Sequence, residues 1–164
     1  MDATVRLYNQ NDIKYMAEIW NEVILSGTAF PQEETLDIKS AVEFFGAQTA
    51  CGAAETGSGI VAGLYILHPN NVGRCGHICN ASYAVLSEYR GRGIGEALVR
   101  HCIGTAAAYG FKILQFNAVV ASNTPALMLY KKLGFVPLGT IPNGFRMPNG
   151  SYADIIPHYL TLNA

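Results

Sequence analysis

The chain has 164 residues, of which 50% are apolar and 14% charged, with a net charge of −1. A chain of this length buries roughly 70% of its unfolded surface, so the composition excludes a disordered protein and favours one domain over residues 1–164. Proteins that hold nucleic acid by its phosphates usually carry a basic excess, so we expect no nucleic-acid partner.

The sequence gives no sign of a membrane segment or a metal site. No apolar run reaches the roughly 20 residues that a membrane span needs, and the N-terminus lacks the order of a signal peptide, so we expect a cytoplasmic protein with no membrane partner. Cys75 and Cys79 would lie about 13 Å apart along a strand. Because one zinc needs both sulfurs at roughly 2.3 Å, we expect no metal, and free thiols at all four cysteines.

The first half of the chain predicts one strand, two helices and then three strands. Apolar residues between 13 and 24 recur every three or four positions, as in an amphipathic helix that Asn11 or Asp12 caps and Gly27 ends. The other elements expected here are a strand at 5–8, a helix from Thr35 or Asp37 to near Gly46, strands at 50–55 and 60–67, and a long strand at 76–85.

The second half predicts alternating helices and strands. In chain order they are a helix at 93–109, a strand at 113–120, a helix at 123–133, and strands at 135–141 and 154–162, with a loop at 142–151. Neighbouring strands without a helix between them pair antiparallel, whereas the strand–helix–strand crossover pairs parallel. The sequence therefore predicts a mixed sheet in an α/β (α+β) fold.

The densest site signal lies where the strand at 76–85 gives way to a helix. It contains Arg90, Gly91, Arg92, Gly93, Ile94, Gly95 and Glu96. Glycines there expose main-chain amides, and the first amides of a helix attract anions. Neither the Gly-Lys-Ser/Thr of a P-loop nor the third glycine of a dinucleotide fingerprint is present, whereas R-x-x-G-x-G is. The signal indicates a pyrophosphate cradle or an ordinary glycine-rich helix cap.

Residues further along complete a larger pattern. Asn117 lies in the next strand, Asn123 opens the next helix, and Tyr130 follows seven residues later on roughly the same face. The helix then runs into Leu-Gly-Phe at 133–135. Together with the cradle, this ordered set resembles the GNAT superfamily of acyl-CoA-dependent N-acetyltransferases over about residues 4–162.

The resemblance implies a GNAT fold and a place for acetyl-CoA. The implied fold is a twisted, mostly antiparallel sheet of about seven strands flanked by about four helices, with acetyl-CoA between the splayed strands 76–85 and 113–120. Pantetheine would lie beside Val85, Asn123 and Ala126, and the pyrophosphate on the amides of residues 90–96. Tyr130 would protonate the departing thiolate. From the residues alone, Tyr130 can equally be a half-buried helix tyrosine, and Asn123 an N-cap.

The acid–base chemistry departs from the family pattern. The attacking amine must be neutral, so a base or a water relay must take its proton. Many relatives place a glutamate on the strand before the cradle, but residues 76–85 contain no carboxylate. His77 is a candidate base because imidazole exchanges protons near neutral pH. It can also be a structural histidine, with the proton leaving to water.

A narrower resemblance concerns three asparagines. The segments around Asn80, Asn117 and Asn123, and the run 141–144, look like the proline-analogue (azetidine-2-carboxylate) N-acetyltransferases. This likeness implies substrate recognition by Asn80 and Asn117 and a catalytic or cofactor role for Asn123. An asparagine suits such a substrate because it both donates and accepts hydrogen bonds. The alternative is that Asn80 and Asn117 satisfy backbone groups in a splayed sheet.

Two loops should wall the acceptor side, namely 28–31 and 142–151. Phe30 and Phe145 suggest an apolar substrate pocket or edges of the core, and Arg146 can bind an acceptor carboxylate or lie in solvent. We expect an enzyme that moves an acetyl group from acetyl-CoA to a small-molecule amine, perhaps an amino acid or analogue, and that forms a homodimer. A protein or peptide acetyltransferase and a non-enzymatic acyl-CoA-binding module are the alternatives.

Overall fold

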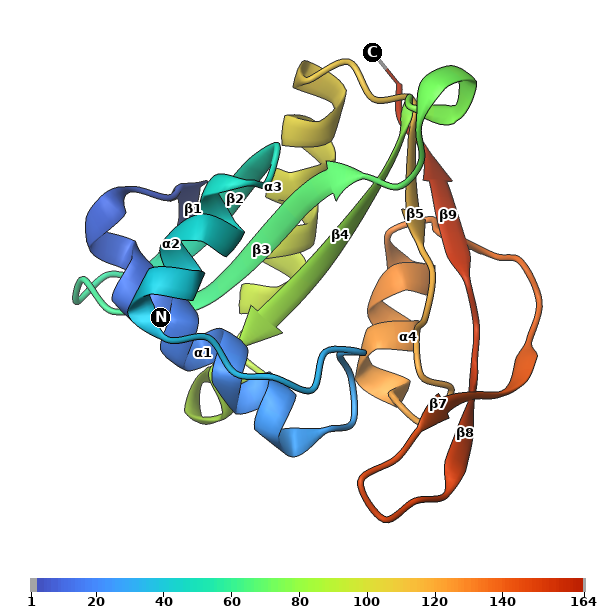
Figure 1. The fold of residues 1–164 in the computed structure, drawn as a ribbon. Helices are drawn as coiled ribbons and strands as arrows, with labels where there is room; N and C mark the ends of the chain where they lie inside the picture. The colour runs from blue at the N-terminus through green and yellow to red at the C-terminus, as the bar shows by residue number, and fades with distance from the viewer. Residues whose placement is uncertain (1–2, 164) are drawn as a thin grey trace.

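The computed structural model describes residues 3–163 and has a seven-stranded mixed sheet as its centre (Figure 1). In spatial order the strands are β1 (Ala3–Leu7), β2 (Ala50–Thr56), β3 (Val61–Pro69), β4 (Ile78–Val85), β5 (Ile113–Phe116), β9 (His158–Thr161) and β6 (Val136–Pro137). Only β4 and β5 pair parallel; the other neighbours pair antiparallel. The predicted GNAT sheet is confirmed.

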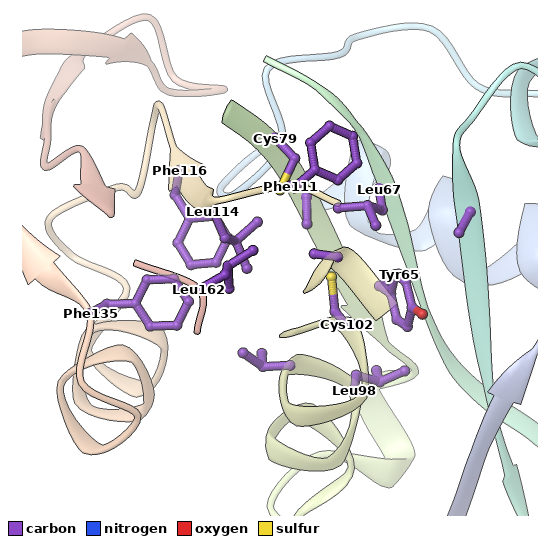
Figure 2. Packing of buried hydrophobic residues seen from close by; sticks show 14 of the residues in the cluster. Tyr65, Leu67, Cys79, Leu98, Cys102, Phe111, Leu114, Phe116, Phe135 and Leu162 are labelled. Carbon is purple, nitrogen blue, oxygen red and sulfur yellow. The ribbon is translucent and has the colours of Figure 1, made fainter. Parts of the chain in front are cut away.

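Four helices cover the two faces of the sheet. They are α1 (Ile13–Ser26), α2 (Ile38–Gly46), α3 (Ile94–Ala108) and α4 (Thr124–Lys132). α1 and α2 pack on one face around Trp20 and Phe45, whereas α3 and α4 pack on the other. Figure 2 shows the α3 side, where Leu98 and Cys102 meet Tyr65 from β3. Within residues 3–163, every helix is too short or too polar to cross a membrane.

The start of α1 differs from the prediction. Asn9 caps a short 3-10 turn (Gln10–Asp12) that leads into α1, and Asp12 makes no side-chain bond to the helix. Its carboxylate instead accepts hydrogen bonds from the Arg6 guanidinium at 2.7 and 3.0 Å. Neither Asn11 nor Asp12 is therefore the side-chain cap, because the Asp12 carboxylate is bound to Arg6 on β1. Gly27, with φ of 65°, ends α1 as expected.

β4 and β5 separate soon after they pair. Their parallel register contains only Ile78 with Ile113 and Cys79 with Leu114, and the two strands diverge beyond these positions (Figure 1). At the divergence Asn80 Nδ2 donates to the Gln115 carbonyl at 3.0 Å. Each strand is shorter than expected, since Gly76 closes a 3-10 turn and β5 stops at Phe116. The splay opens the sheet at its centre.

The first half of the segment predicted as a loop at 142–151 is strand, and only its second half is a turn. β7 (Ile141–Arg146) and β8 (Tyr152–Ile155) form a separate two-stranded sheet with a short turn. Phe145 and Ile155 pack with Val120 in a small core of their own. Glycines and prolines in the segment hid this strand pattern. Gly144 is needed because a Cβ there would lie 2.7 Å from Ile155 Cδ1.

Candidate active site

A cavity of about 580 Å³ opens where β4 and β5 part. Its walls come from β3, β4, α2, α4, residues 116–120 and the loop at 29–32. Its polar lining consists of Gln32, Gln48, His68, Asn80, Ser82, Tyr83, Asn117, Asn123 and Tyr130. Among the described residues that line it, none is Asp, Glu, Lys or Arg. The cavity is therefore polar but free of fixed charge.

The proposed pyrophosphate cradle lies at the start of α3. Gly93 is the N-cap residue with φ of 80°, a left-handed conformation that favours glycine, and it offers no side chain to cap the helix. The first helical bond runs from the Ala97 amide to the Gly93 carbonyl. The amides of Ile94, Gly95 and Glu96 precede that bond, so they have no acceptor within the helix. Three amides at the positive end of a helix suit an anion.

The charged side chains of the cradle are turned to the protein. Arg90 Nε donates to the Val85 carbonyl at 3.1 Å, and Arg92 Nη2 donates to the Glu88 carbonyl at 2.9 Å. Both guanidinium groups therefore brace the loop. The Glu96 carboxylate accepts from Arg100 at 2.9 Å and from Lys132 at 2.6 Å, which joins α3 to α4. Main-chain amides are the groups left to hold a phosphate.

Asn123 and Ala126 occupy the first turn of α4 and both line the cavity. Asn123 Oδ1 accepts from the Ala126 amide at 3.3 Å, so the side chain is the N-cap of the helix. This contact holds the two residues together at the mouth of the splay.

Tyr130 lies two turns further along α4 and also lines the cavity. Its ring packs on Phe116 at 4.5 Å and on Phe135 at 5.4 Å between centroids. Burial raises the pKa of the Tyr130 hydroxyl well above its usual range. The hydroxyl therefore stays protonated at neutral pH and suits a proton donor better than a base.

Tyr83, on β4, also lines the cavity and was missed by sequence reasoning. Its hydroxyl is buried beside the Cys102 thiol and makes no well-formed hydrogen bond among the described residues. Burial raises the pKa of Tyr83 well above its usual range, so this hydroxyl is neutral. Buried polar groups usually have a partner, and the polar side chain beside this hydroxyl is the weakly polar thiol of Cys102.

The two histidines nearest the splay are placed differently. His77 is exposed, precedes β4 and does not line the cavity, so the structure does not bring it to Tyr130. His68, at the end of β3, does line the cavity and sits opposite Asn80 in the sheet register. Sequence reasoning passed over His68 because it stood at the start of a loop; the antiparallel pairing of β3 with β4 is the signal that could have found it.

Asn80 and Asn117 both face the cavity and belong to one polar network. Asn117 Nδ2 donates to Asn70 Oδ1 at 2.7 Å, and its own Oδ1 accepts from Gln115 Nε2 at 3.0 Å. Asn80 donates to the Gln115 carbonyl. Asn80 thus bridges β4 and β5, whereas Asn117 links the end of β5 to the loop after β3.

Phe30 and Phe145 are brought to neighbouring cavities. Phe30 is buried on Trp20 and borders both the main cavity and a second one of about 500 Å³. Phe145 lines only the second cavity. Arg146, beside it, pairs with Glu33 across the mouth of that cavity. The β7–β8 hairpin, the loop at 29–33 and the end of α1 therefore line the second cavity together.

Comparison with known proteins identifies the family. The model of the acetyltransferase (GNAT) family matches residues 14–135, which include the cradle, Asn123 and Tyr130. The chain belongs to the GNAT acetyltransferase family. A GNAT phosphinothricin acetyltransferase from Sinorhizobium meliloti, solved with acetyl-CoA, superposes with a TM-score of 0.91 at 23% identity, over 99% of this chain and 90% of that one. That similarity shows the shared GNAT fold.

Two curated relatives are acyltransferases by name. The N-acetyltransferase aca1 of Schizosaccharomyces pombe is 36% identical over 85 residues, which are 52% of this chain but only 41% of that protein. The L-amino acid N-acyltransferase MnaT of Escherichia coli is 25% identical over 143 residues, which are 85% of this chain and 83% of that protein. The GNAT assignment rests on the family model over residues 14–135, and these two relatives match half to most of the chain.

Proposed function

We propose that this GNAT protein transfers an acetyl group from acetyl-CoA to the amine of a small molecule, an amino acid or a close analogue. The observation that carries the proposal is the uncharged polar cavity between β4 and β5. The same cavity is lined by the residues proposed to contact acetyl-CoA and by those proposed to contact the amine. The name of the Escherichia coli relative, an L-amino acid N-acyltransferase, supports this substrate class.

In this proposal acetyl-CoA, the acetyl donor, would lie along the start of α3 and between the diverging strands β4 and β5. The amides of residues 94–96 would hold the pyrophosphate, with pantetheine running past Val85 and the first turn of α4. Tyr130 would donate its proton to the thiolate as the carbon–sulfur bond breaks, which its protonated state at neutral pH allows.

The acceptor half uses the amide side chains. Asn80 and Asn117 would bind the amine and carboxylate of the substrate, since each amide group can donate and accept. The apolar wall at Phe30 suits a compact carbon skeleton. A ring amine such as a proline analogue fits this description and is the narrower form of the proposal. Phe145 and Arg146, in the second cavity, would contact only a longer acceptor.

The test is an acceptor panel with acetyl-CoA, with free thiol as the readout. The panel contains amino acids, proline and azetidine-2-carboxylate, a peptide with a free N-terminus, and a lysine peptide. We expect turnover with one or more free amino acids and none with the peptides. Turnover confined to peptides would support a protein acetyltransferase. A rise in melting temperature with CoA but no turnover would support a binding module.

A variant pair tests the acceptor site. Asn80→Ala should raise the KM for the amino acid about tenfold, the effect of losing roughly one hydrogen bond to a charged group, while the Kd for acetyl-CoA stays within twofold (about 0.4 kcal/mol). The matched control is Asn163→Ala, an exposed asparagine near the end of the described chain. An unchanged KM in Asn80→Ala would remove Asn80 from the acceptor site.

A further inference from the structure

The cavity holds only one side chain suited to removing a proton from the substrate. The strand β4 lacks a carboxylate, and no Asp or Glu is found among the described residues that line the cavity. The titratable groups in that lining are His68, Tyr83 and Tyr130. Burial raises the pKa of both tyrosines, so neither is an anion at neutral pH. Imidazole, by contrast, accepts and releases protons near neutrality.

The position of His68 places it beside the acceptor asparagine. In the antiparallel pairing of β3 with β4, His68 lies directly opposite Asn80. Side chains of opposite residues share one face, with Cβ atoms about 4.5–5.5 Å apart. Both residues line the cavity, as does Ile66 two positions before His68. A substrate amine bound to Asn80 would therefore lie within reach of the imidazole.

The hydrogen bond of His68 fixes its tautomer. Nδ1 lies 3.0 Å from the Pro69 carbonyl oxygen. A carbonyl oxygen accepts only, so Nδ1 carries the hydrogen and donates it. The neutral ring then keeps a lone pair on Nε2, which is the arrangement that a general base needs.

We propose that His68 is the general base of this enzyme, standing in for the carboxylate that β4 lacks. This inference rests on the proposed function. Nε2 takes one proton from the substrate ammonium, and the amine attacks the thioester carbon. The nitrogen–carbon bond forms as the carbon–sulfur bond breaks. The thiolate gains its proton from Tyr130, which recovers one from the new amide nitrogen. His68 releases its proton to solvent, so the reaction yields one amide, one thiol and one proton.

The surroundings of His68 allow a pH profile to report on it. α2 contributes Phe44 to the same cavity, and Ala47 and Gln48 follow directly after that helix. The loop at 29–32 contributes Phe30 and Gln32, and β4 contributes Asn80, Ser82 and Tyr83. From α4 comes Tyr130. The other titratable groups among these are the two neutral tyrosines. Loss of activity on the acidic side of the profile would therefore report the charging of His68.

The experiment measures kcat/KM for the best amino acid of the panel between pH 5.5 and 9 in the wild type, His68→Gln, His68→Ala and His77→Gln. We expect both His68 variants to lose about 10²- to 10⁴-fold in kcat/KM. We also expect the acidic fall of the profile to disappear, and imidazole to restore activity to His68→Ala. Binding of acetyl-CoA, measured by calorimetry, should stay within twofold and thus show an intact fold.

The outcomes separate the two proposals. No turnover by the wild type with any free amino acid would end the proposed function itself. Turnover by the wild type with a normal pH profile in His68→Gln would overturn the role of His68 alone. A large loss in His77→Gln with little change in His68→Gln would assign the base to His77 instead, and would likewise overturn the inference.

Discussion

The ring of Tyr65 fills the space above Gly52, its direct partner across β2 and β3. A Cβ at residue 52 would lie 2.7 Å from Tyr65 Cδ1, which is closer than real Cβ atoms approach. The ring cannot move aside cheaply because its hydroxyl is anchored to α3. The Tyr65 hydroxyl oxygen lies 2.9 Å from His101 Nδ1 and donates to Thr105 Oγ1 at 3.0 Å. The absence of a side chain at Gly52 thus lets the helix dock on the sheet.

Gly52→Ala should therefore destabilise the fold. Forcing one methyl group into a packed core costs typically about 1–3 kcal/mol, and displacement of Tyr65 would also strain its hydrogen bonds. The control is Gly57→Ala in the β2–β3 turn, where a Cβ meets nothing within 4 Å and a change of less than about 0.5 kcal/mol is expected. Urea unfolding measures both. Equal effects would show that Tyr65 gives way easily.

Tyr130→Phe should lower kcat by about 10²-fold or more, because the thiolate would leave without its proton donor. The Kd for acetyl-CoA should change less than twofold, since the ring still packs on Phe116. Tyr109→Phe, at the exposed end of α3, is the matched control. Stopped-flow turnover and calorimetry give the two quantities. A kcat within threefold of the wild type would remove Tyr130 from the chemistry.

Gly93→Ala should weaken acetyl-CoA binding and stability together. Residue 93 has φ of 80°, where a Cβ costs roughly 1–2 kcal/mol, and relaxation of that strain would turn the amides of α3 away from the phosphate. Gly104→Ala lies in the same helix, exposed and with no atom within 4 Å of the added Cβ. It should raise stability by about 0.5–1 kcal/mol. Thermal shift with and without CoA tests both, and tighter CoA binding in Gly93→Ala would contradict the cradle.

The elements carrying strong periodicity or a cap were predictable from the sequence. α1 ends at Gly27, α2 begins at Asp37 and α4 begins at Asn123, as the residues indicate. The β7–β8 hairpin was not predictable, because its pairing depends on Gly144 fitting against Ile155, a contact between residues that local propensity treats as loop. The prediction of the α1 cap failed because Arg6, on the preceding strand β1, binds the Asp12 carboxylate, a side-chain contact that the helix pattern does not indicate.

In the candidate site, too, features set by local sequence were predictable, whereas features set by contacts between separate segments were not. The glycine-rich turn before α3 and the position of Tyr130 on α4 were predictable because each depends on spacing within a strand–helix junction or a single helix. That His68 and not His77 lines the cavity was not predictable, because the strand register that places His68 opposite Asn80 is a relation between two strands. The place of Tyr83 in the cavity wall was not predictable either, because it depends on how β4 packs against the neighbouring elements.

The ion cluster around Arg6 should make the fold sensitive to acid. Arg6 donates to both oxygens of Asp12 and also to Glu55, and Asn9 donates its amide to Asp12. Burial alone would raise the pKa of Asp12, but the hydrogen bonds from Arg6 and Asn9 outweigh it and hold the pKa below its usual range. A carboxyl with a lowered pKa in the folded state stabilises the protein above its unfolded pKa of about 4. That stability is lost as the pH falls through the lower, folded value.

Asp12→Asn should remove this part of the acid dependence. At pH 7 the variant should lose about 1–3 kcal/mol in the free energy of unfolding, because hydrogen bonds to a buried charge are broken. Between pH 5 and 2 its stability should fall less steeply than that of the wild type. Glu18→Gln, an exposed carboxyl on α1, should follow the wild type within about 0.5 kcal/mol. Urea unfolding at stepped pH gives the curves, and parallel curves for Asp12→Asn and the wild type would place the acid sensitivity elsewhere.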